Sequence, residues 1–310
     1  IIEFMRKRVS ATLILLVFLF NLAGTSVLLT PPGLKMLEEP EQIIKKMPQN
    51  EAFDLIKNIF SSYENFMLTE ETGVIRALFP YWGILEHITI NERSIVTVKE
   101  HTTEMMRLMD DLFIQKGFPY GWELLLCGFF HQFGFSPDMD HNERRLYHID
   151  SGKSAYGNLR NLGVSEKHSE EIQWYIQHQK HIPNLAIFGA LEHIFTEESI
   201  SDFCFQLKEK DIQILTALYI TDFIENHRNM NLDNVLTLDT FMEGEVQKIY
   251  TRLINIAKVK DPKRKYDKIN LFSRYIHSIH KKRINQARTG VVTAELVHPV
   301  FLAKEIVKSN

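Results

Sequence analysis

The chain has 310 residues, of which 45% are hydrophobic and 24% charged, and its net charge is −3. This composition excludes a disordered or fibrous chain and leaves room for more than one compact unit. The two cysteines, Cys127 and Cys204, lie in apolar stretches and form no CxxC pair. They therefore exclude a disulfide scaffold and a cysteine-type zinc site, and we expect both to be buried thiols.

Residues 1–30 form an apolar segment that follows a basic start. Arg6, Lys7 and Arg8 precede an unbroken apolar run over residues 13–20. If Met5 is the first residue made, this pattern favours a signal peptide or a membrane anchor through residues 5–29, and hence an exported or anchored protein. If the chain is a fragment, the same segment is a neck helix below a missing upstream domain, and the protein is cytoplasmic. The sequence leaves both interpretations open.

Residues 34–92 are predicted to form a helical body. Apolar residues recur at helical spacing, as in Phe53, Ile56 and Ile59, and this periodicity is typical of an amphipathic helix. We expect helices over residues 41–46, 51–64 and 72–79, the last ended by Pro80.

Residues 93–235 are predicted to form the central domain, again from helices. Glycines and prolines separate the helical stretches, and Ser165 is a candidate N-cap. No alternating pattern long enough for a sheet is present, so the expected fold class is all-α. The predicted helices cover residues 96–112, 121–133, 148–162, 165–178, 185–195 and 209–227.

Residues 236–310 are predicted to form a basic helical tail. We expect helices over residues 246–258 and 270–287, joined by the polar linker "KVKDPKRKYDK". Between residues 252 and 288 there are twelve lysines and arginines against two aspartates. Such separated charge favours an anionic partner, RNA or a membrane surface, with a solvated helix face as the alternative. No signal specific for DNA is present, and the candidate anion-binding residues are Lys263, Arg264, Lys265, Lys281, Lys282 and Arg283.

Four histidines and one aspartate stand apart from the other polar residues. One histidine lies in "TVKEHTTEMMRLMDDL" and the other three begin or end predicted helices, whereas Asp222 lies within the apolar helix "LTALYITDFIENH". A carboxylate on an apolar face costs free energy unless it is paired or bound to a cation. The histidines are His101, His131, His148 and His178; the others, His181 among them, have no spacing that singles them out.

The order of these five residues resembles that of the HD domain. The segments "TVKEHT", "VIRALFPYWGIL" and "LYHIDSGKSAYGNLRNLGVSEKHSEEIQWYIQHQ" resemble the body and HD-like region of bacterial tRNA nucleotidyltransferases and poly(A) polymerases, over roughly residues 50–230. The resemblance implies an HD-domain-like helical bundle between an N-terminal helical segment and a C-terminal helical tail. We find no glycine-rich turn with paired aspartates, so we expect no nucleotidyltransferase activity from this chain.

The resemblance also implies a metal site with one ligand changed. Gln132 stands where the family has a bridging aspartate, and Phe135 where many members have a lysine. A neutral amide does not offset the repulsion between two dications, so we expect at most one divalent ion. The alternative is a metal-free hydrogen-bonded cluster in which Gln132 donates to Asp222. The implied ligands are His101, His131 and Asp222, with His148 and His178 as the second-ion ligands of two-metal members.

Three functions are compatible with these observations. The first is an RNA- or nucleotide-binding module with little or no catalysis. The second is a single-metal phosphohydrolase that acts on nucleotide or RNA phosphoesters. The third is a membrane-tethered regulatory or structural protein, anchored through residues 5–29.

Overall fold

A computed structural model describes residues 49–90, 96–136, 139, 141–182, 185, 197–227, 246–289 and 306–307. Within these residues the chain is helical, and the β-type pairing there is an isolated bridge between Thr89 and Thr97. The prediction of an all-α fold is therefore confirmed. In the same part of the chain, no helix is long and apolar enough to cross a membrane. Segment 5–29, the helix expected over residues 41–46 and most of that expected over 185–195 lie outside the described residues.

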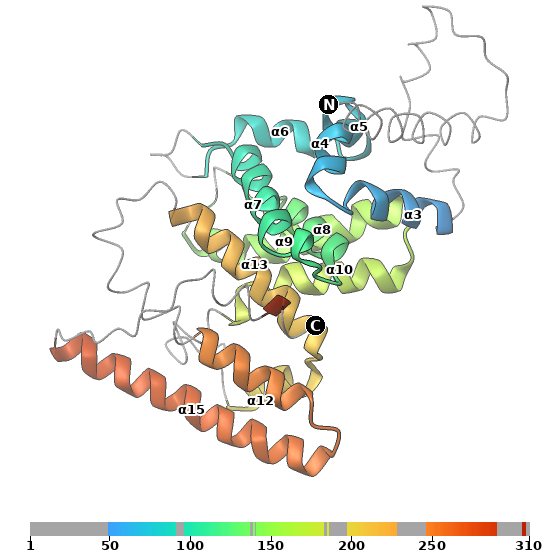
Figure 1. Ribbon diagram of the computed structural model, residues 1–310. Helices are drawn as coiled ribbons and strands as arrows, with labels where there is room; N and C mark the ends of the chain where they lie inside the picture. The colour runs from blue at the N-terminus through green and yellow to red at the C-terminus, as the bar shows by residue number, and fades with distance from the viewer. Residues whose placement is uncertain are drawn as a thin grey trace, which may run out of the picture.

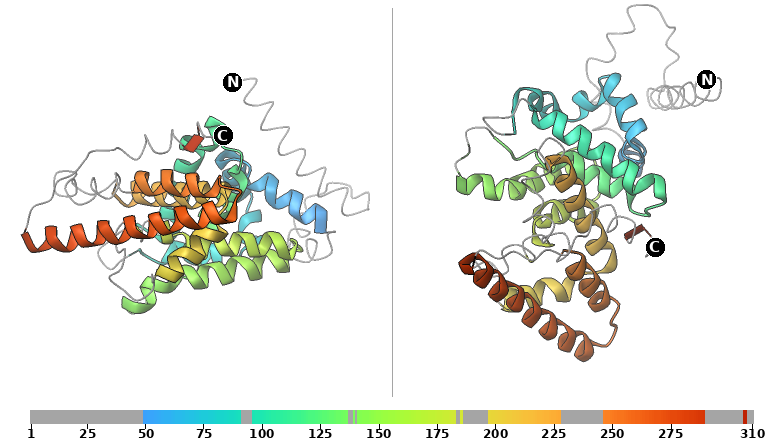
Figure 2. Two further views of the ribbon diagram at one scale, coloured as in Figure 1. Left: turned by 90° about the horizontal axis from the view of Figure 1, so that it is seen from below. Right: turned by 60° about the vertical axis from the view of Figure 1, so that its left-hand side comes forward.

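The helices form three groups along the molecule (Figures 1 and 2). The N-terminal group comprises α3 (Gln49–Ile59), α4 (Tyr63–Glu71), α5 (Val74–Leu78), α6 (Tyr81–Ile84) and the 3-10 turn η2 (Leu85–His87). The central bundle comprises α7 (Val98–Leu112), η3 (Ile114–Lys116), α8 (Gly121–Phe130), α9 (His141–Asn161), α10 (Glu166–His178) and α13 (Glu209–His227). The third group comprises α12 (Glu197–Gln206), the helical segment 246–257 and α15 (Pro262–Thr289), with α12 packed against α15.

Local capping signals set where several helices begin. Thr97 and Glu100 form a reciprocal capping box at the start of α7. The predicted cap at Ser165 is confirmed, because its side chain accepts a hydrogen bond from the backbone N–H of His168 at 3.4 Å. The predicted helix over residues 51–64 was too long, because Ser62 caps a new helix, α4. A side-chain oxygen that takes up the first free N–H groups favours a helix start over continuation.

The polar linker expected between the last two helices is mostly helical. Helix α15 begins at Pro262, eight residues before the predicted start. Asp261 accepts a hydrogen bond from the backbone N–H of Arg264 at 2.8 Å, and proline suits the first helical position because it has no N–H to leave unpaired. Likewise α9 begins at His141, so His148 lies within this helix instead of at its start.

An aromatic cluster joins the N-terminal group to the central bundle. The Phe129 ring lies 4.8 Å from Trp82, 5.0 Å from Phe79 and 5.2 Å from Phe60, centroid to centroid. All four side chains are fully buried, and burial of each large apolar side chain contributes roughly 2 to 3 kcal/mol. The cluster therefore fixes the C-terminal end of α8, where His131 follows.

Two glycines permit close contacts around α9. A Cβ at Gly134 would lie 2.4 Å from both the Tyr147 carbonyl oxygen and the Ser151 backbone nitrogen. The Gly134 N–H donates to the Ser151 hydroxyl at 2.8 Å. A Cβ at Gly152 would lie 2.9 Å from the Gln173 carbonyl oxygen of α10. The turn after His131 therefore lies directly on α9, which in turn packs closely on α10.

Candidate metal centre

His101, His131 and Asp222 converge at one point between three helices. His101 lies on α7, His131 caps the end of α8, and Asp222 lies on α13, and each of these helices packs against the other two. One ligand atom from each side chain lies within 4.8 Å of those of the other two. Both histidines are fully buried, whereas the Asp222 side chain is 33% exposed. The group is thus interior but open to solvent at the aspartate.

Hydrogen bonds hold both imidazoles with the Nε2 atom toward the centre. The two Nε2 atoms are 3.1 Å apart, and His101 Nε2 is 3.3 Å from Asp222 Oδ1. On the far side of each ring, His131 Nδ1–H donates to the Gly128 carbonyl oxygen at 2.5 Å, and His101 Nδ1–H donates to the Glu225 carboxylate. Partners of this kind on the outer nitrogen orient the metal-binding histidines of many proteins.

The two histidines have opposite protonation behaviour. Burial lowers the pKa of His101, but hydrogen bonds to Asp222 and Glu225 outweigh burial and raise it to about 9. Burial and the nearby charge of His101 lower the pKa of His131 to about 4. Burial raises the pKa of Asp222, but the hydrogen bond from His101 outweighs burial and holds it below its usual value. Near pH 7 the group therefore contains one imidazolium, one neutral imidazole and the carboxylate of Asp222.

The two ligand separations that involve His101 fit a divalent ion. An ion about 2.1 Å from each ligand separates neighbouring ligand atoms by about 3.0 Å in octahedral and about 3.4 Å in tetrahedral geometry. Two of the three separations, 3.1 Å between the Nε2 atoms and 3.3 Å from His101 Nε2 to Asp222 Oδ1, lie between these values. The third pair, His131 and Asp222, lies within 4.8 Å. Two histidines and one carboxylate suit zinc, iron or manganese and leave coordination positions open.

The metal-free alternative expected a hydrogen bond from Gln132 to Asp222, but the described residues show none between these two side chains. The Gln132 side-chain amide instead donates to the Tyr147 hydroxyl on α9 at 3.3 Å. The imidazolium of His101 already provides Asp222 with a donor, which removes the need for an amide donor. Gln132 is buried, so this amide adds a neutral polar group, and no negative charge, beside the three candidate ligands.

His148 and His178 are not part of the three-residue group, among the residues whose placement is described. His178 Nδ1–H donates to the Trp174 carbonyl oxygen at 2.8 Å, and its ring stacks on Trp174 with centroids 4.3 Å apart. His181, which the sequence did not single out, lies 4.4 Å from the His178 ring. Burial lowers the pKa of His178 and, with the charge of His178, lowers that of His181 to about 3. These two imidazoles are thus neutral members of an aromatic stack.

Three further residues of the site were not identified from the sequence. Glu225 lies three positions after Asp222 on α13, and this spacing, which places both on one helix face, is a signal that could have found it. Tyr147 and Lys180 give no such signal, because their place beside the site depends on how α9 and the end of α10 pack. Lys180 Nζ lies 4.3 Å from the centroid of the Tyr147 ring.

The basic tail presents only part of its charge as free side chains. Lys263 and Arg264 are exposed. Lys265 instead donates to the Phe205 carbonyl oxygen at the end of α12, at 2.8 Å. Lys281, Lys282 and Arg283 lie on α15, but their side chains are outside the described residues.

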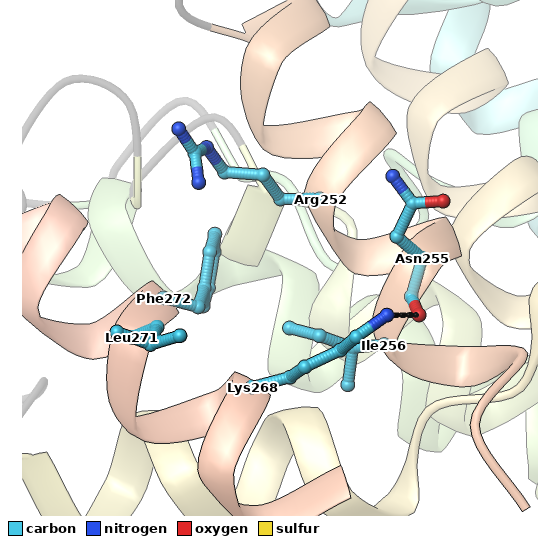
Figure 3. Close-up of a pocket in the computed structure, with 6 residues that line it drawn as sticks. All are labelled: Arg252, Asn255, Ile256, Lys268, Leu271 and Phe272. Carbon is cyan, nitrogen blue, oxygen red and sulfur yellow. Dashed lines mark hydrogen bonds between the residues drawn. The ribbon is translucent and has the colours of Figure 1, made fainter. Parts of the chain in front are cut away.

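A shallow pocket of about 240 Å³ lies between segment 246–257 and α15 (Figure 3). Its apolar lining comes from both helices, and Arg252 and Lys268 add two cations. The Arg252 guanidinium also lies 4.0 Å from the centroid of the Tyr275 ring. The other lining residues are Asn255, Ile256, Leu271 and Phe272.

Comparison of the sequence with protein-family models and with curated proteins gives no match in either case.

Proposed function

We propose that this chain is an HD-like helical protein that holds one divalent ion with His101, His131 and Asp222. We further propose that it uses the ion to bind a phosphate group of a nucleotide or RNA, with little or no hydrolysis. The observation that carries the proposal is the spacing of the three inward atoms, together with the outer-nitrogen hydrogen bonds of both histidines. The resemblance of the chain to HD-domain proteins supports the same ligands.

A bound divalent ion would supply the positive charge that attracts and orients a phosphoryl oxygen. The protein supplies three ligands from separate helices, so positions on the ion stay open to the phosphate. The partial exposure of Asp222 gives that phosphate a route to the site. Gln132 adds no negative charge, and the proposal is therefore limited to one ion per chain.

The competing interpretation is a metal-free cluster, in which protonated His101 satisfies both carboxylates. Titration with Co²⁺ or Mn²⁺ separates the two, with His131→Gln and Asp222→Asn as test variants. We expect one ion per wild-type chain and at least about hundredfold weaker binding in either variant, because each loses one of three ligands. His87→Gln changes an exposed histidine and should bind like wild type. Equal affinity in His131→Gln and wild type would refute the metal site.

A second candidate function is a single-metal phosphohydrolase, which the solvent exposure of Asp222 favours. It requires metal-dependent hydrolysis of bis(p-nitrophenyl) phosphate that Asp222→Asn abolishes. Gln132→Asp, which adds a carboxylate next to His131, is expected to strengthen metal binding about tenfold by charge attraction. A rise in turnover in this variant, with folding unchanged by circular dichroism, would favour hydrolysis over binding alone.

RNA is the form of phosphate ligand that the tail favours. Exposed Lys263 and Arg264 and the cations of the α15 pocket would contact backbone phosphates. Replacing both exposed residues by glutamine should weaken binding of a transfer RNA and lower the salt dependence of log K by about two phosphate contacts. The control pair Lys57→Gln and Lys116→Gln removes the same charge from exposed positions elsewhere. Equal loss in both pairs would show a nonspecific effect of net charge.

A further inference from the structure

Lys180 lies just past the end of α10, with its ammonium group over the ring of Tyr147. Its Nζ atom lies 4.3 Å from the centroid of the Tyr147 ring. The Tyr147 hydroxyl in turn accepts the hydrogen bond from Gln132, the residue after His131. Lys180 is therefore linked to the metal ligands through two side chains, Tyr147 and Gln132.

Among the described residues, the Lys180 ammonium has no carboxylate within ion-pair distance, and its contact there is the face of the Tyr147 ring. Burial lowers the pKa of Lys180, and the charge of Asp222 opposes that effect. The charge of Lys180 in turn contributes to the lowered pKa values of Asp222 and His131. A half-buried cation that has no ion-pair partner in the described part of the chain is suited to a ligand anion, because a charged partner there is incompletely screened by water.

We infer that Lys180 is the anion-binding residue of this site: it binds one phosphoryl oxygen of a phosphodiester while the metal ion attracts another. The inference rests on the proposed function, since it assigns a ligand group to the same site. It assigns a role to Lys180, which is not one of the metal-binding residues. It also names the chemical class of the bound anion.

The charges at the site select a phosphodiester over a phosphomonoester. With the ion bound, the dication and Lys180 face the carboxylates of Asp222 and Glu225. One net positive charge is left, and the single negative charge of a diester neutralises it. A monoester dianion would leave one uncompensated negative charge in a partly buried site, which is unfavourable. Without the ion, Lys180 faces two carboxylates and leaves no positive charge for an anion, so phosphate binding should require metal.

The test uses dimethyl phosphate as the probe and Mn²⁺ as the ion, with the full chain. Paramagnetic broadening of the ³¹P resonance reports phosphate close to the ion. Lys180→Met keeps most of the side-chain length and removes the charge, whereas Lys180→Arg keeps the charge. Lys153→Met is the matched control, since Lys153 is an exposed lysine on α9 that pairs with Asp150 at 2.8 Å.

Lys180→Met is expected to weaken dimethyl phosphate binding about tenfold, the range of one charge-assisted hydrogen bond. Its Mn²⁺ affinity should stay within about threefold of wild type, because no metal ligand changes. Lys180→Arg and Lys153→Met should both bind the probe within about threefold of wild type. In wild type, methyl phosphate should bind more weakly than dimethyl phosphate.

Three results would overturn the inference while leaving the metal site intact. They are unchanged probe affinity in Lys180→Met, tighter binding of methyl phosphate than dimethyl phosphate, and metal binding without any probe broadening in wild type. Loss of both metal and probe in Lys180→Met would assign Lys180 a structural role and would also overturn it. Absence of Mn²⁺ binding by wild type refutes the proposed function itself, so the two failures are distinguishable.

Discussion

Metal binding to this site is expected to release about one proton per ion near pH 7. The His101 Nε2 atom is a candidate ligand, yet in the metal-free protein it carries the proton that bonds to Asp222 and His131. The pKa of His101 is raised to about 9, whereas that of His131 is lowered to about 4. His131 therefore has no proton to lose above pH 5, and the released proton comes from His101 alone.

The size of the effect on metal affinity follows from the difference between pH 7 and the pKa of His101. Two pH units of proton competition weaken the apparent metal affinity about a hundredfold, or about 3 kcal/mol. The association constant should therefore rise about tenfold per pH unit between pH 6 and pH 8.5, and it should level off above pH 9. Asp222 adds nothing to this slope, because its lowered pKa keeps it ionised throughout.

Isothermal titration of Co²⁺ in buffers with different ionisation enthalpies measures the released protons directly. Glu225→Gln removes a charge that raises the pKa of His101, so it should release fewer protons at pH 7 and flatten the pH dependence. Glu209→Gln, at the start of the same helix and 3.5 Å from Lys258, should behave like wild type. Release of no proton at pH 7 by wild-type protein would refute the assigned protonation state of His101.

Three further predictions concern stability. Gly134→Ala should destabilise the fold by about 2 kcal/mol through overpacking against the α9 backbone. Gly157→Ala is the control, because a Cβ there meets nothing within 4 Å, and it should be neutral or stabilising. Equal urea midpoints in both variants would contradict the close approach of Gly134 to α9. Asp110→Ala should cost about 1 to 2 kcal/mol, since this buried carboxylate accepts the Tyr63 backbone N–H at 3.1 Å; an unchanged free energy of unfolding would show that water replaces it. The folded pKa of His101, about 9 against an ordinary 6.5, contributes up to about 3 kcal/mol. That stability is fully present below pH 6.5 and is lost as pH rises through 9, so urea unfolding of the chelator-treated protein should show the loss and His101→Gln should not.

The positions of the central helices follow from local sequence. Helix α10 matches its predicted range to within one residue because Ser165 provides a side-chain cap, and such signals act within three or four residues. The predicted helix boundaries are wrong where a competing local signal acts. Ser62 divided one predicted helix, and the Asp261-Pro262 pair started α15 inside an expected linker. Both signals can be identified from the sequence, so these boundaries are predictable in principle.

The sequence identified only some residues of the candidate site. Asp222 stood out because a carboxylate in an apolar helix needs a partner, and the expected HD-domain order pointed to the histidines. His181 looked like any other histidine, although it lies beside His178. Lys180 has no feature in the sequence that distinguishes it from other lysines. Their neighbours are decided by the packing of α9, α10 and α12, which local spacing does not encode.

The sequence by itself determined the helical class, most helix starts and the residue types available for metal binding. These depend on hydrophobic period, caps and the cost of burying charge, all of which act over a few residues. Only the tertiary structure decided which side chains meet. The Glu225 carboxylate reaches His101 across 124 positions of sequence, and Gln132 turns to Tyr147 instead of Asp222. Such pairings depend on where packed helices cross, because rotating one helix against another exchanges partners without changing the pattern of either.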